Sequence, residues 1–217
     1  MYPYQNIIFD LDGTLTDPGE GITNSVAYAL RTFGIEVPPR EKLYPFIGPP
    51  LIDSFMKYYD MDEQSARSAV DKYREYFSAG GLFENKVYDG IPALLAGLKS
   101  KGMRLYVATS KPEGYTLRII HRFGLDKFFD FVAGSTMDSS RVKKSDVIKY
   151  LFDSVPALKH ERCVMIGDRH HDIEGARQNG IDSVGVLWGY GDKEELTGAG
   201  ALHIASDITE LRSILGI

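Results

Sequence analysis

The chain has 217 residues, of which 43% are hydrophobic and 25% charged, values typical of a folded protein with its own apolar core. Its net charge of −5 at pH 7 excludes a general attraction to nucleic acid or to an anionic membrane. The single cysteine cannot form an internal disulfide, and no apolar run is long enough to span a bilayer. We therefore expect a cytoplasmic protein with no nucleic-acid or membrane partner.

The first apolar run, residues 6–9, predicts a β-strand that ends at Asp10. The residues that follow have helical spacing instead of a second strand. Their spacing predicts a first helix that ends at Gly34. It also predicts two more helices, over 51–59 and 62–77. A helical insert therefore follows the first strand.

The rest of the chain alternates strands with helices. Further strands are expected over 103–108, 129–134, 163–166 and 183–187. Helices are expected over 91–101, 112–123, 145–153 and 172–179. This alternation predicts an α/β fold with a Rossmann-like parallel sheet, because right-handed βαβ units cover both faces of such a sheet. We assign residues 1–15 and 86–217 to this core and residues 16–85 to an inserted all-α cap. Cys163 lies in an apolar strand, which favours a buried thiol over a nucleophile.

Carboxylates and hydroxyls follow three of the predicted strands. Asp10 and Asp12 follow the first strand, Thr109 follows the second, and Asp168 and Asp172 follow the strand at 163–166. Ligands bind at the carboxyl ends of the strands in open α/β sheets. Each element has a structural alternative, since Asp before Gly is common in turns and Asp172 could cap the next helix. All of them together, in this order, favour a functional site.

Four carboxylates in one place would repel one another, and a hard divalent cation relieves that repulsion. Mg²⁺ suits such a cluster, because it binds a few carboxylates, waters and phosphate oxygens. His170 and His171 suggest zinc as an alternative, but zinc needs three or four N or S ligands and adjacent histidines rarely point to one centre. We therefore expect both histidines at the surface or at the rim of the site.

The same acids suggest phosphoryl transfer. Asp10 can attack phosphorus and form an acyl phosphate, while Asp12 protonates the leaving oxygen and later activates water. A phosphoryl group also needs a cation. Lys143 and Lys144 directly precede a predicted helix, whose N-terminus itself favours anions, and we expect one of the two in the site.

These residues resemble the haloacid dehalogenase superfamily of phosphohydrolases, and within it the phosphoglycolate phosphatase-like branch. The similarity covers essentially the whole chain. The motif DLDGTLTD occupies residues 10–17, Thr109 matches the second motif, GDRHHD occupies residues 167–172, and residues 181–191 resemble a further stretch of this branch. The helical insert resembles the type 1 cap of the family.

The resemblance implies Asp10 as nucleophile and Asp12 as general acid and base. It implies Mg²⁺ bound by the Asp10 carboxylate, the Asp12 carbonyl and Asp168, with support from Asp172. Thr109 and the lysine of the third motif would hold the phosphoryl group. The chain departs from the family there, because it has Lys143-Lys144-Ser145 where the family usually has Lys-Pro. We favour Lys144, which directly precedes the helical pattern.

The expected activity is therefore Mg²⁺-dependent hydrolysis of a small phosphorylated metabolite. Phosphoglycolate, a nucleotide and a sugar phosphate all remain open as substrates. A β-phosphoglucomutase-like phosphomutase is the alternative, and a non-catalytic binding protein is less favoured because all four carboxylates are present. Asp12 argues against dehalogenase chemistry, which needs no acid at that position. We expect a monomer or a weak homodimer.

Overall fold

The computed structural model describes residues 3–138 and 140–217, and within them no helix is long and apolar enough to cross a membrane. The chain divides into two compact units. Unit 1 contains Met1–Thr16 and Val87–Ile217, and unit 2 contains Asp17–Lys86.

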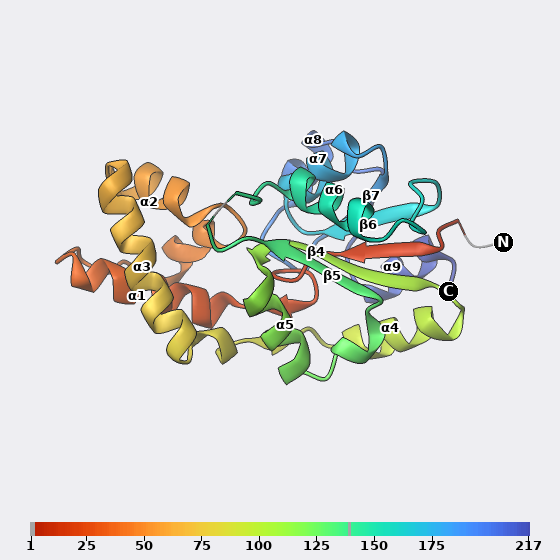
Figure 1. Cartoon of the computed structure of the whole chain (residues 1–217), viewed down its shortest axis with the longest axis horizontal. Helices are drawn as coiled ribbons and strands as arrows, with labels where there is room; N and C mark the ends of the chain where they lie inside the picture. Colours follow the sequence, from red (N-terminus) through yellow and green to blue (C-terminus); the bar gives the residue numbers. More distant parts are fainter. Residues whose placement is uncertain (1–2, 139) are drawn as a thin grey trace. The chain divides into compact units, whose positions relative to one another are not determined.

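Unit 1 is built on a six-stranded sheet whose order is β5-β4-β1-β6-β7-β8 (Figure 1). Its strands are β1 (Asn6–Phe9), β4 (Arg104–Pro112), β5 (Phe131–Ser135), β6 (Cys163–Gly167), β7 (Asp182–Val186) and β8 (His203–Ala205). Every pair of neighbours is parallel. Phe9 pairs with Val107 on one side and with Ile166 on the other, so the carboxyl ends of β1, β4 and β6 lie together.

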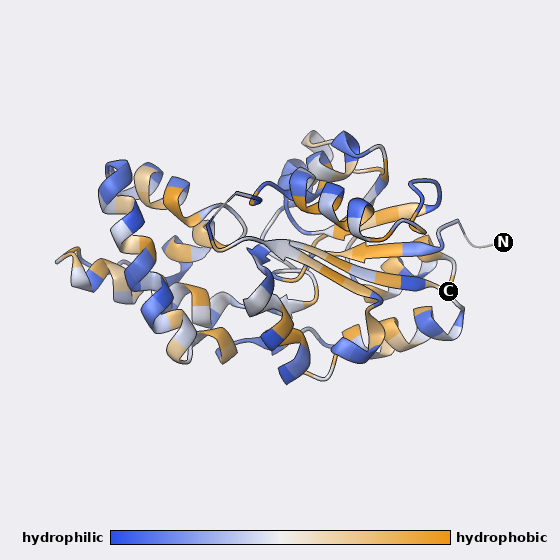
Figure 2. Ribbon diagram, viewed as in Figure 1, coloured by the Kyte–Doolittle hydropathy of each residue, from blue (hydrophilic) through white to orange (hydrophobic). Residues whose placement is uncertain are grey.

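Helices cover this sheet, which confirms the expected α/β fold. They are α4 (Ile91–Ser100), α5 (Glu113–Arg122), the short η3 (Asp126–Phe128), α6 (Lys144–Ser154), α7 (His170–Gln178), α8 (Lys193–Gly198) and α9 (Ile208–Leu215). The strands are the apolar centre of the unit (Figure 2). One buried cluster joins Ile8 of β1 and Met165 of β6 to Val147 and Leu151 of α6.

Cys163 belongs to that buried cluster at the start of β6. Its thiol donates a hydrogen bond to the Lys159 carbonyl at 2.8 Å. Burial raises the pKa of the thiol to about 12, so it stays protonated at neutral pH. The residue is the buried strand thiol that the sequence favours.

Unit 2 is helical. It contains α1 (Gly19–Thr32), η1 (Arg40–Phe46), α2 (Leu51–Tyr59), α3 (Glu63–Ala79) and η2 (Gly81–Phe83). The two short strands β2 (Thr16–Asp17) and β3 (Lys86–Val87) pair with each other, and each contains one of the two boundaries between the units. The unit has an aromatic core in which Phe46 meets Phe55 edge to face, with ring centroids 5.0 Å apart.

Several predicted bounds were wrong. The strand predicted over 103–108 continues to Pro112, because β4 resumes its pairing with β5 after a register shift beyond Ala108. Helix α7 begins at His170, two residues before the predicted start. Elements α8, β8 and α9 were not predicted; all three are short, and a periodic pattern is weak over so few residues.

Candidate active site

The carboxyl ends of β1 and β6 bring three acids together inside unit 1. Carboxylate oxygens of Asp10, Asp168 and Asp172 all lie within 4.8 Å of one another. All three side chains are buried. Buried carboxylates at this spacing repel strongly unless a cation lies among them. The donor set consists of carboxylate oxygens alone, which fits Mg²⁺.

Lys144 supplies one cation to this cluster. Its Nζ lies 2.7 Å from Oδ1 of Asp10 and 2.8 Å from Oδ1 of Asp172, and it donates a hydrogen bond to the Ala108 carbonyl at 2.9 Å. Burial alone would lower the pKa of Lys144, but the two carboxylates outweigh it and raise that pKa above its ordinary value. Lys143 is the exposed residue that precedes helix α6. Of the two candidate lysines, the structure therefore places Lys144 among the acids.

Asp172 has two partners, one for each carboxylate oxygen. Its Oδ2 accepts the backbone N–H of Arg169 at 3.1 Å, while Oδ1 lies against Lys144. The residue thus stabilises the start of α7, as its structural alternative predicts, and also belongs to the acid cluster. Burial raises the pKa of Asp172 to about 6, with Lys144 opposing the rise and Asp10 adding to it.

Asp168 is held by the loops around it. Its Oδ1 accepts the Thr14 hydroxyl at 3.1 Å, and its Oδ2 accepts the backbone N–H of Tyr190 at 2.8 Å. Burial, Asp172 and Asp10 raise the pKa of Asp168 well above its ordinary value, because they disfavour its charged form. A bound divalent cation would restore that charged form.

Glycines allow the backbone to approach Asp168 closely. A β-carbon on Gly189 would lie 2.4 Å from Oδ2 of Asp168, and one on Gly13 would lie 2.1 Å from the same atom. Gly13 also has φ of +84°, a conformation that L side chains rarely adopt. Sequence reasoning missed these contacts, although Gly13 and Gly189 lie in stretches that resemble the family.

Asp12 forms an ion pair that sequence reasoning also missed. Its Oδ2 contacts Nζ of Lys111, which lies near the end of β4. The two side chains are 11% and 6% exposed. Burial raises the pKa of Asp12, although the Lys111 ammonium opposes the rise. The available signal was a lysine two residues after Thr109, near the end of a strand whose first half is mostly apolar.

Thr109 lies within β4, two residues beyond Val107, which pairs with Phe9 at the end of β1. Its side chain is buried, and its Oγ1 accepts the backbone N–H of Lys111 at 3.3 Å. The strand ends next to the site, but Thr109 is a residue inside the strand, not the residue that follows it.

The two histidines are partly exposed at the start of α7. Nδ1 of His170 lies 2.7 Å from Oε1 of Glu195, which also accepts Nε of Arg169 at 2.9 Å. Burial lowers the pKa of His171 to about 4, so this ring is neutral at pH 7. Their partial exposure agrees with the expected place at the surface or rim.

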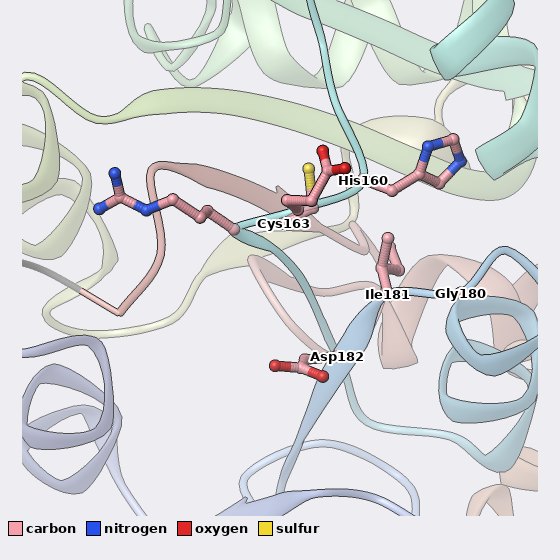
Figure 3. Close-up of a pocket in the computed structure, with 7 residues that line it drawn as sticks. His160, Cys163, Gly180, Ile181 and Asp182 are labelled. Carbon is pink, nitrogen blue, oxygen red and sulfur yellow. The ribbon is translucent and has the colours of Figure 1, made fainter.

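A cavity of about 400 Å³ opens where the strands β6 and β7 begin. It is lined by residues at the starts of β6 and β7, among them Cys163, Ile181 and Asp182 (Figure 3). Asp168 follows the opposite end of β6. This cavity is therefore separate from the acid cluster.

The chain is similar to known proteins over most of its length. The family model for haloacid dehalogenase-like hydrolases matches residues 7–186. A 5'-nucleotidase of Pseudomonas aeruginosa is 48% identical over 98% of this chain and 96% of its own. The tyrosine-protein kinase PtkA of Mycobacterium tuberculosis is 42% identical over 98% of this chain and 73% of its own. The crystal structure of a predicted phosphatase from Clostridium acetobutylicum matches with a TM-score of 0.94 and 49% identity, over 99% of each chain.

Proposed function

Because the chain belongs to the haloacid dehalogenase-like hydrolase family and is a phosphatase, we propose that it hydrolyses a small phosphate monoester with Mg²⁺ and forms a phosphoenzyme on Asp10. The buried cluster of Asp10, Asp168 and Asp172 around Lys144 is the observation that carries this proposal. Such a cluster can hold a cation and a phosphoryl group and also provides a nucleophile.

The Asp10 and Asp168 carboxylates and the Asp12 carbonyl would hold Mg²⁺, which would neutralise charge on the phosphoryl oxygens. An oxygen of the Asp10 carboxylate attacks phosphorus, and the bond between phosphorus and the leaving oxygen breaks. Asp12 gives that oxygen a proton. Asp12 then takes a proton from water, which attacks phosphorus and frees Asp10 with release of inorganic phosphate.

Lys144 and Thr109 would hold the transferring phosphoryl group. Lys144 contacts Oδ1 of Asp10, so its ammonium lies beside the carboxylate that would attack phosphorus. Cations and hydrogen-bond donors fixed in a buried site stabilise the charge that develops during transfer. Asp172 supports this arrangement through Lys144.

We propose a nucleoside 5'-monophosphate as the first substrate to test, because the Pseudomonas aeruginosa relative with 48% identity is named a 5'-nucleotidase. Phosphoglycolate and sugar phosphates are the other classes. A matched panel of these phosphates, assayed for phosphate release with Mg²⁺, tests the proposal. Release from none of them would contradict it. The partner would be this small phosphorylated metabolite, and the chain a monomer or weak homodimer.

The phosphoenzyme can be detected directly. Acid quench of the enzyme during turnover should give a protein heavier by one phosphoryl group, and the group should be absent from Asp10→Asn. Phosphate release without any trapped phosphoenzyme in a rapid quench would favour direct attack by water. The comparisons do not favour the phosphomutase alternative, and β-glucose 1-phosphate with a sugar bisphosphate tests it.

A further inference from the structure

Lys111 and Asp12 form a buried ion pair between distant parts of the chain. Nζ of Lys111 contacts Oδ2 of Asp12, and the two side chains are 6% and 11% exposed. Asp12 follows β1, whereas Lys111 lies near the end of β4. The contact is therefore formed by the folded sheet.

Stability alone does not account for a lysine at this place. Burial of an ammonium costs several kcal/mol, and a well-packed apolar residue often serves as well as a buried ion pair. Most side chains of β4 before it are buried and apolar, including Leu105 and Val107. The burial of this lysine therefore has a cost, which points to a role for its charge.

The pair leaves the two oxygens of Asp12 in different environments. Lys111 holds Oδ2, whereas Oδ1 is buried and has no hydrogen-bond partner among the residues that the structure describes. An unsatisfied buried oxygen is costly unless a ligand or a water uses it. Oδ1 is therefore the oxygen that is available for proton exchange with a substrate or a water.

The backbone fixes both partners. Lys111 lies in the irregular part of β4, where the register with β5 shifts between Ala108 and Pro112, and its N–H donates to Thr109. Asp12 forms an isolated bridge with Thr16. These backbone contacts hold the two residues at positions from which their side chains meet.

We propose that Lys111 is a positioning residue that holds Oδ2 of Asp12 and thereby orients Oδ1 for proton transfer to the leaving oxygen and from water. This inference rests on the proposed function, in which Asp12 is the general acid and base. Lys111 would act through Asp12, in contrast to Lys144, which contacts the nucleophile.

Substrates with different leaving groups can distinguish a role in proton transfer from a role in binding or in nucleophilic attack. A nucleoside monophosphate has an alkoxide leaving group that needs a proton, whereas p-nitrophenyl phosphate has a leaving group that departs with little help. The ratio kcat/KM reports the steps up to leaving-group release, before water attacks the phosphoenzyme. A loss of Asp12 orientation should therefore lower kcat/KM far more for the alkyl phosphate.

The test compares Lys111→Met, Lys111→Arg and the exposed control Lys101→Met with both substrates. We expect Lys111→Met to lower kcat/KM about 100-fold for the nucleoside monophosphate and less than about 5-fold for p-nitrophenyl phosphate. Lys111→Arg should recover part of the loss because it keeps a cation. Lys101→Met should match the wild type. The double variant Lys111→Met with Asp12→Asn should be no worse than Asp12→Asn alone, since both act on one group.

The proposal would be overturned if Lys111→Met lowered kcat/KM equally for both substrates or for neither. Additive losses in the double variant would also overturn it. Thermal unfolding shows whether each variant folds, and Lys111→Gln replaces Lys111→Met if the latter does not. Failure of the proposed function itself is seen in the wild type, as absence of phosphate release or of a phosphoenzyme. The two failures are therefore distinguishable.

Discussion

The Lys144 ammonium lies 2.7 Å from Oδ1 of Asp10, although the two residues belong to the two separate chain segments that form unit 1. The same ammonium reaches Oδ1 of Asp172 at 2.8 Å. A single buried cation thus contacts the proposed nucleophile and the acid in the first turn of α7. Its loss would leave two buried carboxylates without compensation, and this relationship leads to the first prediction.

Lys144→Met should lower kcat/KM by at least about 100-fold, because it removes a cation from the phosphoryl site. It should also lower the melting temperature of the metal-free protein, since the carboxylates lose their counter-charge. Lys143→Met is the matched control, because Lys143 is exposed, and it should resemble the wild type. Phosphate release and thermal unfolding measure the two effects. Equal defects in the two variants would contradict the assignment of Lys144.

Asp10→Asn should lower kcat at least about 1,000-fold, because an amide cannot form the acyl phosphate. The circular dichroism spectrum should stay that of the wild type. Asp153→Asn removes an exposed carboxyl group on α6 and should keep full activity. Normal turnover in Asp10→Asn would refute the nucleophile assignment.

Mg²⁺ should stabilise the folded protein. At a concentration of 100 times its Kd, a ligand adds about 2.7 kcal/mol, which corresponds to a rise in melting temperature of roughly 5–10 °C for a chain of this size. Asp168→Asn should remove most of that rise, because Asp168 belongs to the buried acid cluster. A chelator should stop phosphate release and Mg²⁺ should restore it. Full activity in the chelator would exclude the metal.

Much of this site could be predicted from the sequence because parallel strands place their carboxyl ends at one edge. Asp10 and Asp168 follow neighbouring strands, so we could predict that they lie close together without knowing how side chains pack. Lys144 was favoured because it precedes a helix, and it is the first residue of α6. These inferences depend on periodicity and chain order, which a sequence displays.

Contacts made by irregular backbone could not be predicted in the same way. Lys111 was missed because the second strand was expected to end at residue 108, whereas β4 continues past a register shift. The hydrogen bond from Tyr190 to Asp168 depends on how a loop folds back over the site. No spacing in the sequence specifies either contact.

Gly189→Ala should damage the site, because its β-carbon would lie 2.4 Å from the Asp168 carboxylate. We expect at least a 10-fold loss of kcat/KM and a weaker thermal response to Mg²⁺. Gly114→Ala is the control: its β-carbon would meet nothing within 4 Å, and alanine should stabilise helix α5 by about 0.5–1 kcal/mol. Wild-type activity in Gly189→Ala would show that the loop can move away without loss.

Glu195 should stabilise the fold at neutral pH. Burial opposes its ionisation, but hydrogen bonds from Arg169 and His170 lower its pKa to about 2, below the ordinary value of 4.5. Because the folded pKa is the lower one, this contribution is present above about pH 4.5 and is lost as the pH falls toward 2. Glu195→Gln should therefore cost about 1–2 kcal/mol in urea unfolding at pH 7 and much less at pH 3. A difference that is constant with pH would contradict the assignment.

The central place of β1 in the sheet also bears on how the chain is made. Asn6 pairs with Arg104 on one side and with Cys163 on the other, so β1 leaves the ribosome well before the two strands with which it pairs are synthesised. Unit 2 is one continuous segment and can form its own contacts as soon as Lys86 has emerged. We expect nascent chains that stop before Cys163 to carry an ordered helical segment beside a strand with an open edge, a form that aggregates readily and depends on chaperones.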